Sequence, residues 1–267
     1  MSEIRGSYLE ALNLSEGDGE LEFIRQLQSR HLARFSFNSL AVVLSEDIPL
    51  DSESLHKKIV QEGRGGYCFE HNKLTYDVLF EMGFDVRILL ARVVYKNGGE
   101  VPKTHRVTLL KLGENRYIVD TGFGQFGSRF PVSLTSGVEQ GEGAERYRVV
   151  RDSNNEYALQ IFQKDDFVTL YTFDLARHIE SDCLLGHFYS HRHEQAVFVN
   201  NLVVCRKDAN CIRSLRNGEF HRIQEGATEV VMIDGASILQ KLLTEEFGLS
   251  VNSSEAEFLY GKFSCGE

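Results

Sequence analysis

Two adjacent glycines lead directly into a helical pattern that begins with a cysteine, in the heptapeptide RGGYCFE at residues 64–70. Apolar residues then recur at helical spacing up to Leu79, and Gly83 ends the pattern as a glycine C-cap does. The spacing predicts a helix with Cys68 in its first turn. The positive end of the helix dipole and the nearby Arg64 are expected to lower the thiol pKa. The glycines are expected to leave room for an incoming ligand.

Two further residues favour a catalytic role over the alternative, in which the cysteine is merely a small buried residue next to a tight turn. His105 begins a strand-like segment, and Asp120 ends a second one that starts at Tyr117. The turn-like residues 113–115 join the two strands, so a hairpin would bring His105 and Asp120 close together, far from the turn. The order of Cys68, His105 and Asp120, and the elements that carry them, therefore permit a triad.

These residues carry a resemblance to the arylamine N-acetyltransferase family. The heptapeptide at 64–70, the later histidine and VDTGFG at 119–124 follow the family's three active-site motifs in order and approximate spacing. Upstream, RHL at 30–32, IPLD at 48–51 and KIV at 58–60 also match, so the resemblance runs from about residue 20 to the end. It implies that Cys68 is the acyl-accepting nucleophile, His105 its base and Asp120 the carboxylate that orients the histidine, in a papain-like arrangement.

The resemblance also implies the substrates. Acetyl-CoA would be the donor co-substrate, and an arylamine or arylhydrazine the acceptor, in a ping-pong reaction. Three residues near the motifs are expected to contact the acceptor: Phe37, Thr104 and Phe123.

Coenzyme contacts are expected from three other residues: Gly122, Gly124 and Tyr189. Gly122 and Gly124 would let the backbone approach a pyrophosphate, although a Gly-x-Gly sequence is more often only a turn. Tyr189 matches a family position associated with the nucleotide end of the coenzyme. No metal is expected, because the histidines at 187, 191 and 193 lack the cysteines and carboxylates of a standard cluster.

The chain departs from the family pattern at two places. Asn38 stands where the family usually has a glutamate that pairs with the arginine of the glycine motif. Three interpretations of Arg64 remain open: a bond to Asn38, a bond to another acid such as Glu70, or a direction toward ligand. The second departure is SHRHE at 190–194, near the expected coenzyme site.

The 267 residues are 42% hydrophobic and 25% charged, which is typical of a globular chain with a sizeable core. A net charge of −10 disfavours nucleic acid or anionic membrane as a partner. Without a signal-like N-terminus or a long apolar run, we expect the cytoplasm. Five cysteines without paired spacing, Cys265 among them, predict free thiols.

The hydrophobic periodicity predicts an α+β fold with a helical bundle that carries the nucleophile at 1–85, a β-barrel or sheet with the histidine and aspartate at 86–190, and mixed α/β structure at 191–267. The resemblance implies the three-part architecture of a helical bundle, a central antiparallel β-barrel and an α/β lid. Expected helices lie around 7–12, 19–28 and 52–60, with a final one at 236–247. Expected strands include 86–95, the two triad strands, 147–150, 157–162, 168–173, 197–205 and 229–233, with a hairpin turn at 97–99.

Other functions remain open at this level. An amide synthase of the same family, which releases a polyketide-type acyl chain, would keep the triad, as would a thiol hydrolase or a transglutaminase-like enzyme. A third alternative is a non-catalytic binding module on a decayed enzyme fold. The natural amine, the acyl-chain length and the oligomeric state do not follow from the sequence.

Overall fold

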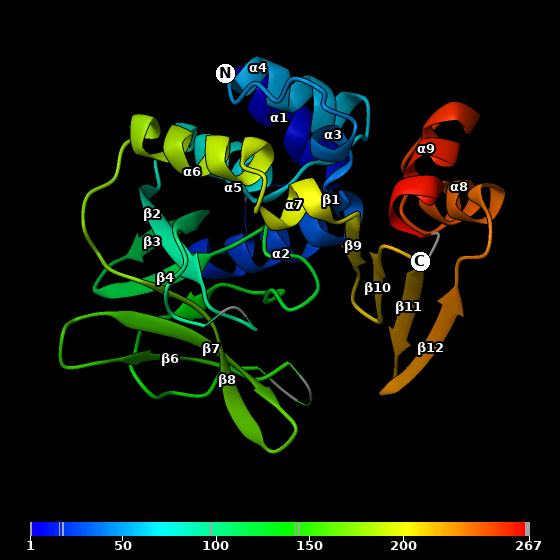
Figure 1. Cartoon of the computed structure of the whole chain (residues 1–267). Coiled ribbons are helices and arrows are strands. Elements are labelled where there is room, and N and C mark those ends of the chain that lie inside the picture. Colours follow the sequence, from blue (N-terminus) through cyan, green and yellow to red (C-terminus); the bar gives the residue numbers. More distant parts are fainter. Residues whose placement is uncertain are drawn as a thin grey trace.

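A computed structural model of the protein describes residues 2–264 except residues 16, 18, 97, 142 and 144. Helices dominate the N-terminal part, a seven-stranded antiparallel sheet occupies the middle, and a five-stranded sheet with two helices lies at the C-terminal end (Figure 1). The predicted α+β class is confirmed. Cys265 and Asn97, the first residue of the expected hairpin turn, lie outside the described residues.

The N-terminal helices pack around one apolar core that includes Leu27, Leu74 and Val78. The helix predicted from Cys68 begins at that residue, and Gly83 follows its end with a positive φ of 87°. The first helix starts earlier than expected, and the segment predicted at 52–60 divides into an α-helical and a π-helical turn. The elements are α1 Ser2–Ala11, α2 Glu20–Arg34, α3 Leu40–Val43, α4 Ser52–Leu55, the π-helical η1 His56–Gln61 and α5 Cys68–Glu81.

The seven-stranded sheet curls into a nearly closed barrel. Its strand order is β5-β4-β3-β2-β8-β7-β6. Isolated bridges such as Gln140 to Tyr147 connect the segment that follows β5 to β6, which lies at the opposite end of this order. Inward-facing residues that alternate along the strands, for example Val107 and Leu109 on β3, fill the interior. The strands are β2 Asp85–Val93, β3 Lys103–Leu112, β4 Asn115–Val119, β5 Val132–Ser133, β6 Tyr147–Arg151, β7 Tyr157–Gln163 and β8 Asp166–Phe173.

The C-terminal part differs most from the expectation. The strand predicted at 197–205 is a short helix followed by a strand, two hairpin strands were not predicted, and the helix at 236 is followed by another. In the missed strands β10 (CIRSLR) and β11 (EFHRIQ), the apolar residues do not alternate with polar ones, which gives a weak strand pattern. The elements are α6 Glu180–Arg192, α7 Val197–Asn200, β9 Val203–Lys207, β10 Cys211–Arg216, β11 Glu219–Gln224, β12 Ala227–Met232, α8 Ala236–Glu245 and α9 Ser253–Phe263.

The N-terminal part also contributes a strand to the C-terminal sheet. Strand β1, Phe37–Asn38, pairs antiparallel with β9, and Phe37 forms a parallel bridge with Gly66 on its other side. The loop that leads into α5 is therefore attached to the edge of the five-stranded sheet. Helix α5 packs against β3 of the barrel, so the start of this helix lies where the parts of the fold meet (Figure 1).

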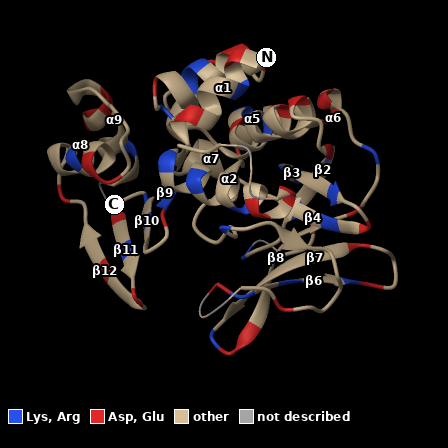
Figure 2. Ribbon diagram, turned by 180° about the vertical axis from the view of Figure 1, so that it is seen from behind, with Lys and Arg blue, Asp and Glu red and all other residues tan. Residues whose placement is uncertain are grey.

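Charged residues of both signs are scattered over the elements visible in Figure 2, as expected for a chain with 29 basic and 39 acidic residues. Among the described helices, none combines the length and apolarity needed to cross a bilayer. Four cysteines, at positions 68, 183, 205 and 211, are free and buried.

Candidate active site

The sulfur of Cys68 is bordered by the strand that carries the predicted base. Cys68 is only 3% exposed, and its Sγ lies 3.6 Å from the carbonyl oxygen of Thr104. The backbone N–H groups of Phe69 and Arg106 lie near enough to the sulfur to favour its charged form. Because His105 stands between Thr104 and Arg106, both of its chain neighbours lie beside Sγ. The structure thus brings the predicted nucleophile and the predicted base to one buried place.

His105 and Asp120 form a direct hydrogen bond, with 2.7 Å between Nε2 of the ring and Oδ2 of the carboxylate. The β3–β4 ladder pairs Thr108 with Val119, so His105 lies beyond the ladder and Asp120 immediately follows it. The pair meets through side chains rather than as directly opposed ladder residues. Since Nε2 is occupied by Asp120, Nδ1 is the ring nitrogen left for the sulfur.

Aromatic rings surround this histidine. The ring centroids of Phe123 and Tyr171 lie 5.2 and 5.1 Å from that of His105. Burial and then the charge of Asp120 raise the pKa of Tyr171, so its hydroxyl stays protonated. The rings exclude water from the His105–Asp120 pair, which strengthens the interaction between them.

The Asp120 carboxylate is ionised in spite of its burial. Burial by itself would raise its pKa, but the neighbouring His105, the amide of Asn72 and the N–H of Gly122 outweigh burial and hold the pKa below the ordinary value. Oδ1 accepts from Asn72 Nδ2 at 2.9 Å and from the Gly122 backbone N–H at 3.0 Å.

The expectation of a lowered thiol pKa is wrong. Burial raises the pKa of Cys68, and the charge of Asp120 raises it further, whereas the nearby backbone N–H groups of Phe69 and Arg106 lower it by less. The removal of water destabilises a thiolate at this position more than the start of the helix stabilises it. The resting thiol is therefore protonated, and attack requires a base that takes its proton.

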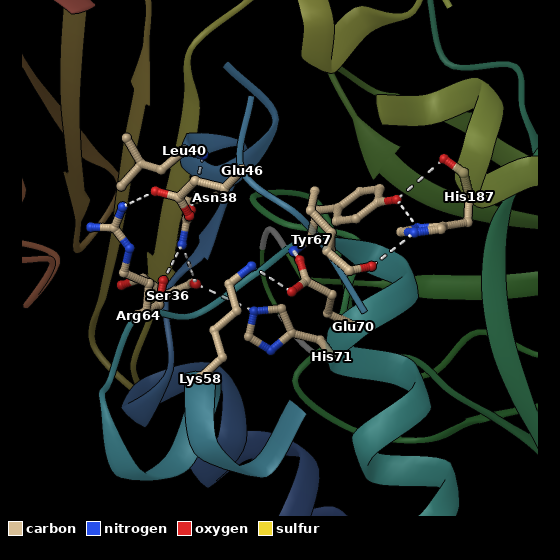
Figure 3. Close-up of polar contacts among 11 residues, drawn as sticks. Ser36, Asn38, Leu40, Glu46, Lys58, Arg64, Tyr67, Glu70, His71 and His187 are labelled. Carbon is tan, nitrogen blue, oxygen red and sulfur yellow. Dashed lines mark hydrogen bonds and ion pairs between the residues drawn. The ribbon is translucent and has the colours of Figure 1, made fainter. Parts of the chain in front are cut away.

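Arg64 does not supply the second positive charge that the sequence suggested. Its guanidinium bonds the carboxylate of Glu46 and, at 2.8 Å, the carbonyl oxygen of Ser250. Figure 3 shows this guanidinium on the side of the loop opposite to His187. Of the three interpretations, pairing with another acid holds, but that acid is Glu46 rather than Glu70.

Asn38 instead secures the backbone of the same loop. Its Nδ2 donates to the carbonyl oxygens of Arg64 at 2.9 Å and Ser36 at 3.2 Å, and its Oδ1 accepts from the N–H of Leu40 at 3.0 Å. These contacts satisfy the buried amide without any charge. The departure from the family's glutamate is thus accommodated within the loop (Figure 3).

Neighbouring protein atoms leave no space for a side chain at either of the two glycines. Gly65 has a φ of +62°, and a Cβ there would lie 2.0 Å from the carbonyl oxygen of Ser36. A Cβ on Gly66 would lie 2.7 Å from Oε2 of Glu70. The space that the sequence suggested for a ligand is occupied by these groups, and the glycines allow the loop to pack closely against them.

The residues expected to contact the acceptor lie around the same centre. Phe37 is buried in the apolar cluster that contains Cys68, Thr104 contributes the carbonyl next to the sulfur, and Phe123 packs on His105. Their role in acceptor binding stays a prediction.

The residues expected to contact the coenzyme are more dispersed. A Cβ on Gly122 would lie 2.8 Å from the Cα of Cys68, so this glycine first of all lets the loop after β4 approach the start of α5. Gly124 has a φ of +81° and lies beside the ring of Phe37. Tyr189 lies on α6 and stacks on His193 with 4.4 Å between centroids. Their coenzyme contacts stay a prediction.

The sequence interpretation overlooked Asn72. This residue is fully buried and hydrogen bonds the Asp120 carboxylate and the backbone beside His105. A signal was present, because Asn72 follows Cys68 by four positions and therefore lies on the same helix face. A buried polar side chain on that face is expected to have a hydrogen-bond partner.

A family model described as N-acetyltransferase matches residues 20–256. The arylamine N-acetyltransferase of Escherichia coli (strain K12) is 33% identical over 263 residues, which cover 97% of this chain and 93% of the relative. The arylamine N-acetyltransferase / N-hydroxyarylamine O-acetyltransferase of Salmonella typhimurium (strain LT2) is 33% identical over 242 residues, 89% of this chain and 85% of the relative.

Solved structures give the same result. The arylamine N-acetyltransferase from Salmonella typhimurium superposes with a TM-score of 0.91 at 30% identity and covers 98% of this chain and 100% of its own. The Mycobacterium marinum arylamine N-acetyltransferase in complex with CoA has a TM-score of 0.90 at 28% identity, with 97% and 98% covered.

Proposed function

The chain belongs to the arylamine N-acetyltransferase family and is an enzyme, and we propose that it transfers an acetyl group from acetyl-CoA to the nitrogen of an arylamine or arylhydrazine through a thioester on Cys68. The observation that carries this mechanism is the convergence of Cys68, His105 and Asp120 in one buried site, from a helix start, a strand and the loop after the next strand.

In the first half-reaction, the Cys68 sulfur attacks the acetyl carbonyl carbon. Because the thiol pKa is raised, His105 takes the proton as the carbon–sulfur bond forms, and Asp120 stabilises the resulting imidazolium. The bond between the acetyl group and the coenzyme sulfur then breaks. His105 returns its proton to the departing thiolate, which leaves as coenzyme A.

In the second half-reaction, the amine nitrogen attacks the thioester carbonyl on Cys68. His105 accepts a proton from the nitrogen, the carbon–sulfur bond breaks, and the proton passes to the sulfur of Cys68. The products are the N-acetyl compound and the original thiol. Because the donor product leaves before the acceptor reacts, the kinetics are ping-pong.

For the acceptor we propose contacts from Phe37, Thr104 and Phe123, which lie around the sulfur. Gly122, Gly124 and Tyr189 are proposed for the coenzyme. A solved relative with CoA bound, at 28% identity, supports coenzyme A as the carrier of the acetyl group that is donated. We propose the cytoplasm for the reaction, because four free cysteines without a disulfide among the described residues fit a reducing compartment.

The test is to incubate the protein with acetyl-CoA and no amine and to measure its intact mass. One acetyl group should be added, a peptide map should locate it on Cys68, and an arylamine or arylhydrazine should remove it. Cys68→Ala should not become acetylated, whereas Cys211→Ala, which removes another buried thiol, should. An unacetylated wild type, or an acetyl group on another cysteine, would contradict the mechanism.

A further inference from the structure

One buried amide contacts the segments that carry all three proposed triad residues. Asn72 follows Cys68 by one helical turn on α5 and is fully buried. Its Nδ2 donates to Oδ1 of Asp120 at 2.9 Å and to the carbonyl oxygen of Arg106 at 2.6 Å. Its Oδ1 accepts from the backbone N–H of Thr121 at 2.8 Å and from the hydroxyl of the same residue at 3.2 Å.

We propose that Asn72 is a positioning residue for acetyl transfer, which sets the orientation and the ionisation of Asp120 and fixes the peptide beside His105 relative to the helix of Cys68. The proposal rests on the proposed function, since it assigns Asn72 a role in that mechanism.

The orientation of the Asn72 amide is determined by its partners. Both donor positions face acceptors, on Asp120 and Arg106, and both acceptor positions receive donors from Thr121. A flipped amide would set its oxygen against the carboxylate and the carbonyl, and its NH₂ against an N–H donor. The side chain therefore has one favourable arrangement.

This arrangement decides which carboxylate oxygen faces the histidine. Asn72 and the Gly122 N–H both donate to Oδ1 of Asp120, while His105 bonds Oδ2. Two donors on Oδ1 set the rotation of the carboxylate and direct Oδ2 to Nε2. The same donors favour the charged form of Asp120, which the imidazolium formed during the reaction requires.

The second donor bond holds the backbone on the other side of His105. Asn72 bonds the carbonyl of Arg106, and the N–H of the same residue lies near enough to the Cys68 sulfur to favour its charged form. One side chain of the nucleophile's helix thus fixes the Arg106–Val107 peptide, which directly follows the peptide whose N–H faces the nucleophile. A shift of this peptide would change the position of His105 relative to the sulfur, and small errors in such distances cost large factors in rate.

The experiment compares the pH dependence of single-turnover Cys68 acetylation by acetyl-CoA, read by intact mass, in the wild type, Asn72→Asp and Asn72→Ala. Asn72→Asp has the same shape and keeps the acceptor for Thr121, but it replaces the donor with an oxygen. Loss of a buried hydrogen bond to a charged group predicts a rate about 10- to 100-fold lower at neutral pH in both variants.

The two variants should differ at acidic pH. In Asn72→Asp, two carboxylates share one site, which raises the pKa at which the pair binds its first proton. Once bound, this proton restores a donor toward Asp120. Its acetylation rate should therefore rise relative to that of Asn72→Ala as the pH falls. The Michaelis constant for acetyl-CoA should change little, because Asn72 is buried behind the triad.

Thr75→Val is the matched control. Thr75 is also buried on α5, and its hydroxyl bonds Thr121 and Tyr8 in the same polar network, without contact to the triad. It should lose stability and keep an acetylation rate within about two-fold of the wild type. If the Asn72 variants lose stability as Thr75→Val does and retain the wild-type rate and pH profile, the positioning role is refuted.

Iodoacetamide separates this result from failure of the proposed function. If the wild type is not acetylated, the proposed function fails. The alkylation rate of Cys68 against pH then still reports on the base beside it. A pH profile of alkylation that changes in Asn72→Asp but not in Thr75→Val supports the inference, and profiles identical to that of the wild type overturn it.

Discussion

Lys58→Met removes the positive partner of a carboxylate that is buried directly beneath the nucleophile loop. The side chain of Glu70 is 1% exposed, its Oε1 lies 2.6 Å from Nζ of Lys58, and its Oε2 accepts the backbone N–H of Tyr67 at 3.1 Å (Figure 3). Burial raises the pKa of Glu70, and Lys58 is the largest influence in the opposite direction. Without the ammonium group, the Tyr67 N–H is the one of these two partners that remains on the carboxylate.

Removal of one partner from a buried ion pair costs about 3–5 kcal/mol of unfolding free energy. The Lys58 side chain is 16% exposed, so water partly replaces it, and we expect the lower end, about 3 kcal/mol at neutral pH.

The deficit should depend on pH with a definite sign. In the variant, the folded-state pKa of Glu70 rises further above its unfolded value, so the folded state binds the proton more tightly. This contribution is fully present below the ordinary glutamate pKa and is lost as the pH rises through the raised folded pKa. The unfolding free energy of the variant should therefore approach that of the wild type at acidic pH. Above the ordinary glutamate pKa, the difference between the two should grow by at most about 1.4 kcal/mol per pH unit.

The assay is urea denaturation across this pH range. Lys57→Met is the matched control, because Lys57 is 70% exposed and its only described acidic partner, Glu62, is 51% exposed, so it should change stability by less than about 0.5 kcal/mol. In a Lys58→Met/Glu70→Gln double variant the pH dependence should disappear. A deficit that is constant with pH, or no deficit, would refute the reasoning that Lys58 neutralises a buried charge.

Three further predictions concern the same loop and the triad. Gly65→Ala should destabilise far more than Gly63→Ala in thermal unfolding, because both have positive φ but only Gly65 has a backbone oxygen 2.0 Å from the new Cβ; equal losses would contradict the packing argument. Asp120→Asn should remain folded by circular dichroism and lose about 10³-fold or more in steady-state acetyl transfer, since it cannot stabilise the imidazolium; near wild-type turnover would remove it from the mechanism. Glu46→Gln should lower the unfolding free energy by about 1 kcal/mol or less, and with it the melting temperature slightly, and should leave the Michaelis constant for acetyl-CoA unchanged. A clear change in that constant would assign Arg64 to binding of the donor instead.

Local patterns in the sequence determined the elements that carry the reacting groups. The 3.6-residue period after Cys68 predicted α5 from its first residue, and the alternating strands around the turn at 113–115 predicted the hairpin of His105 and Asp120. Such signals depend on neighbours a few positions apart, so a single sequence contains them. The strands at 211–216 and 219–224 escaped prediction because their apolar residues do not alternate with polar ones.

Tertiary structure alone decided the chemistry around those groups. The pKa of Cys68 rises because packing removes water from the thiol, which no pattern near Cys68 in the chain reveals. Arg64 bonds the carbonyl of Ser250, 186 positions away, and the Asn72 amide joins the helix to the backbone of two other segments. Burial and contacts between distant positions depend on how the finished elements pack, and this packing is what turns three predicted residues into one site.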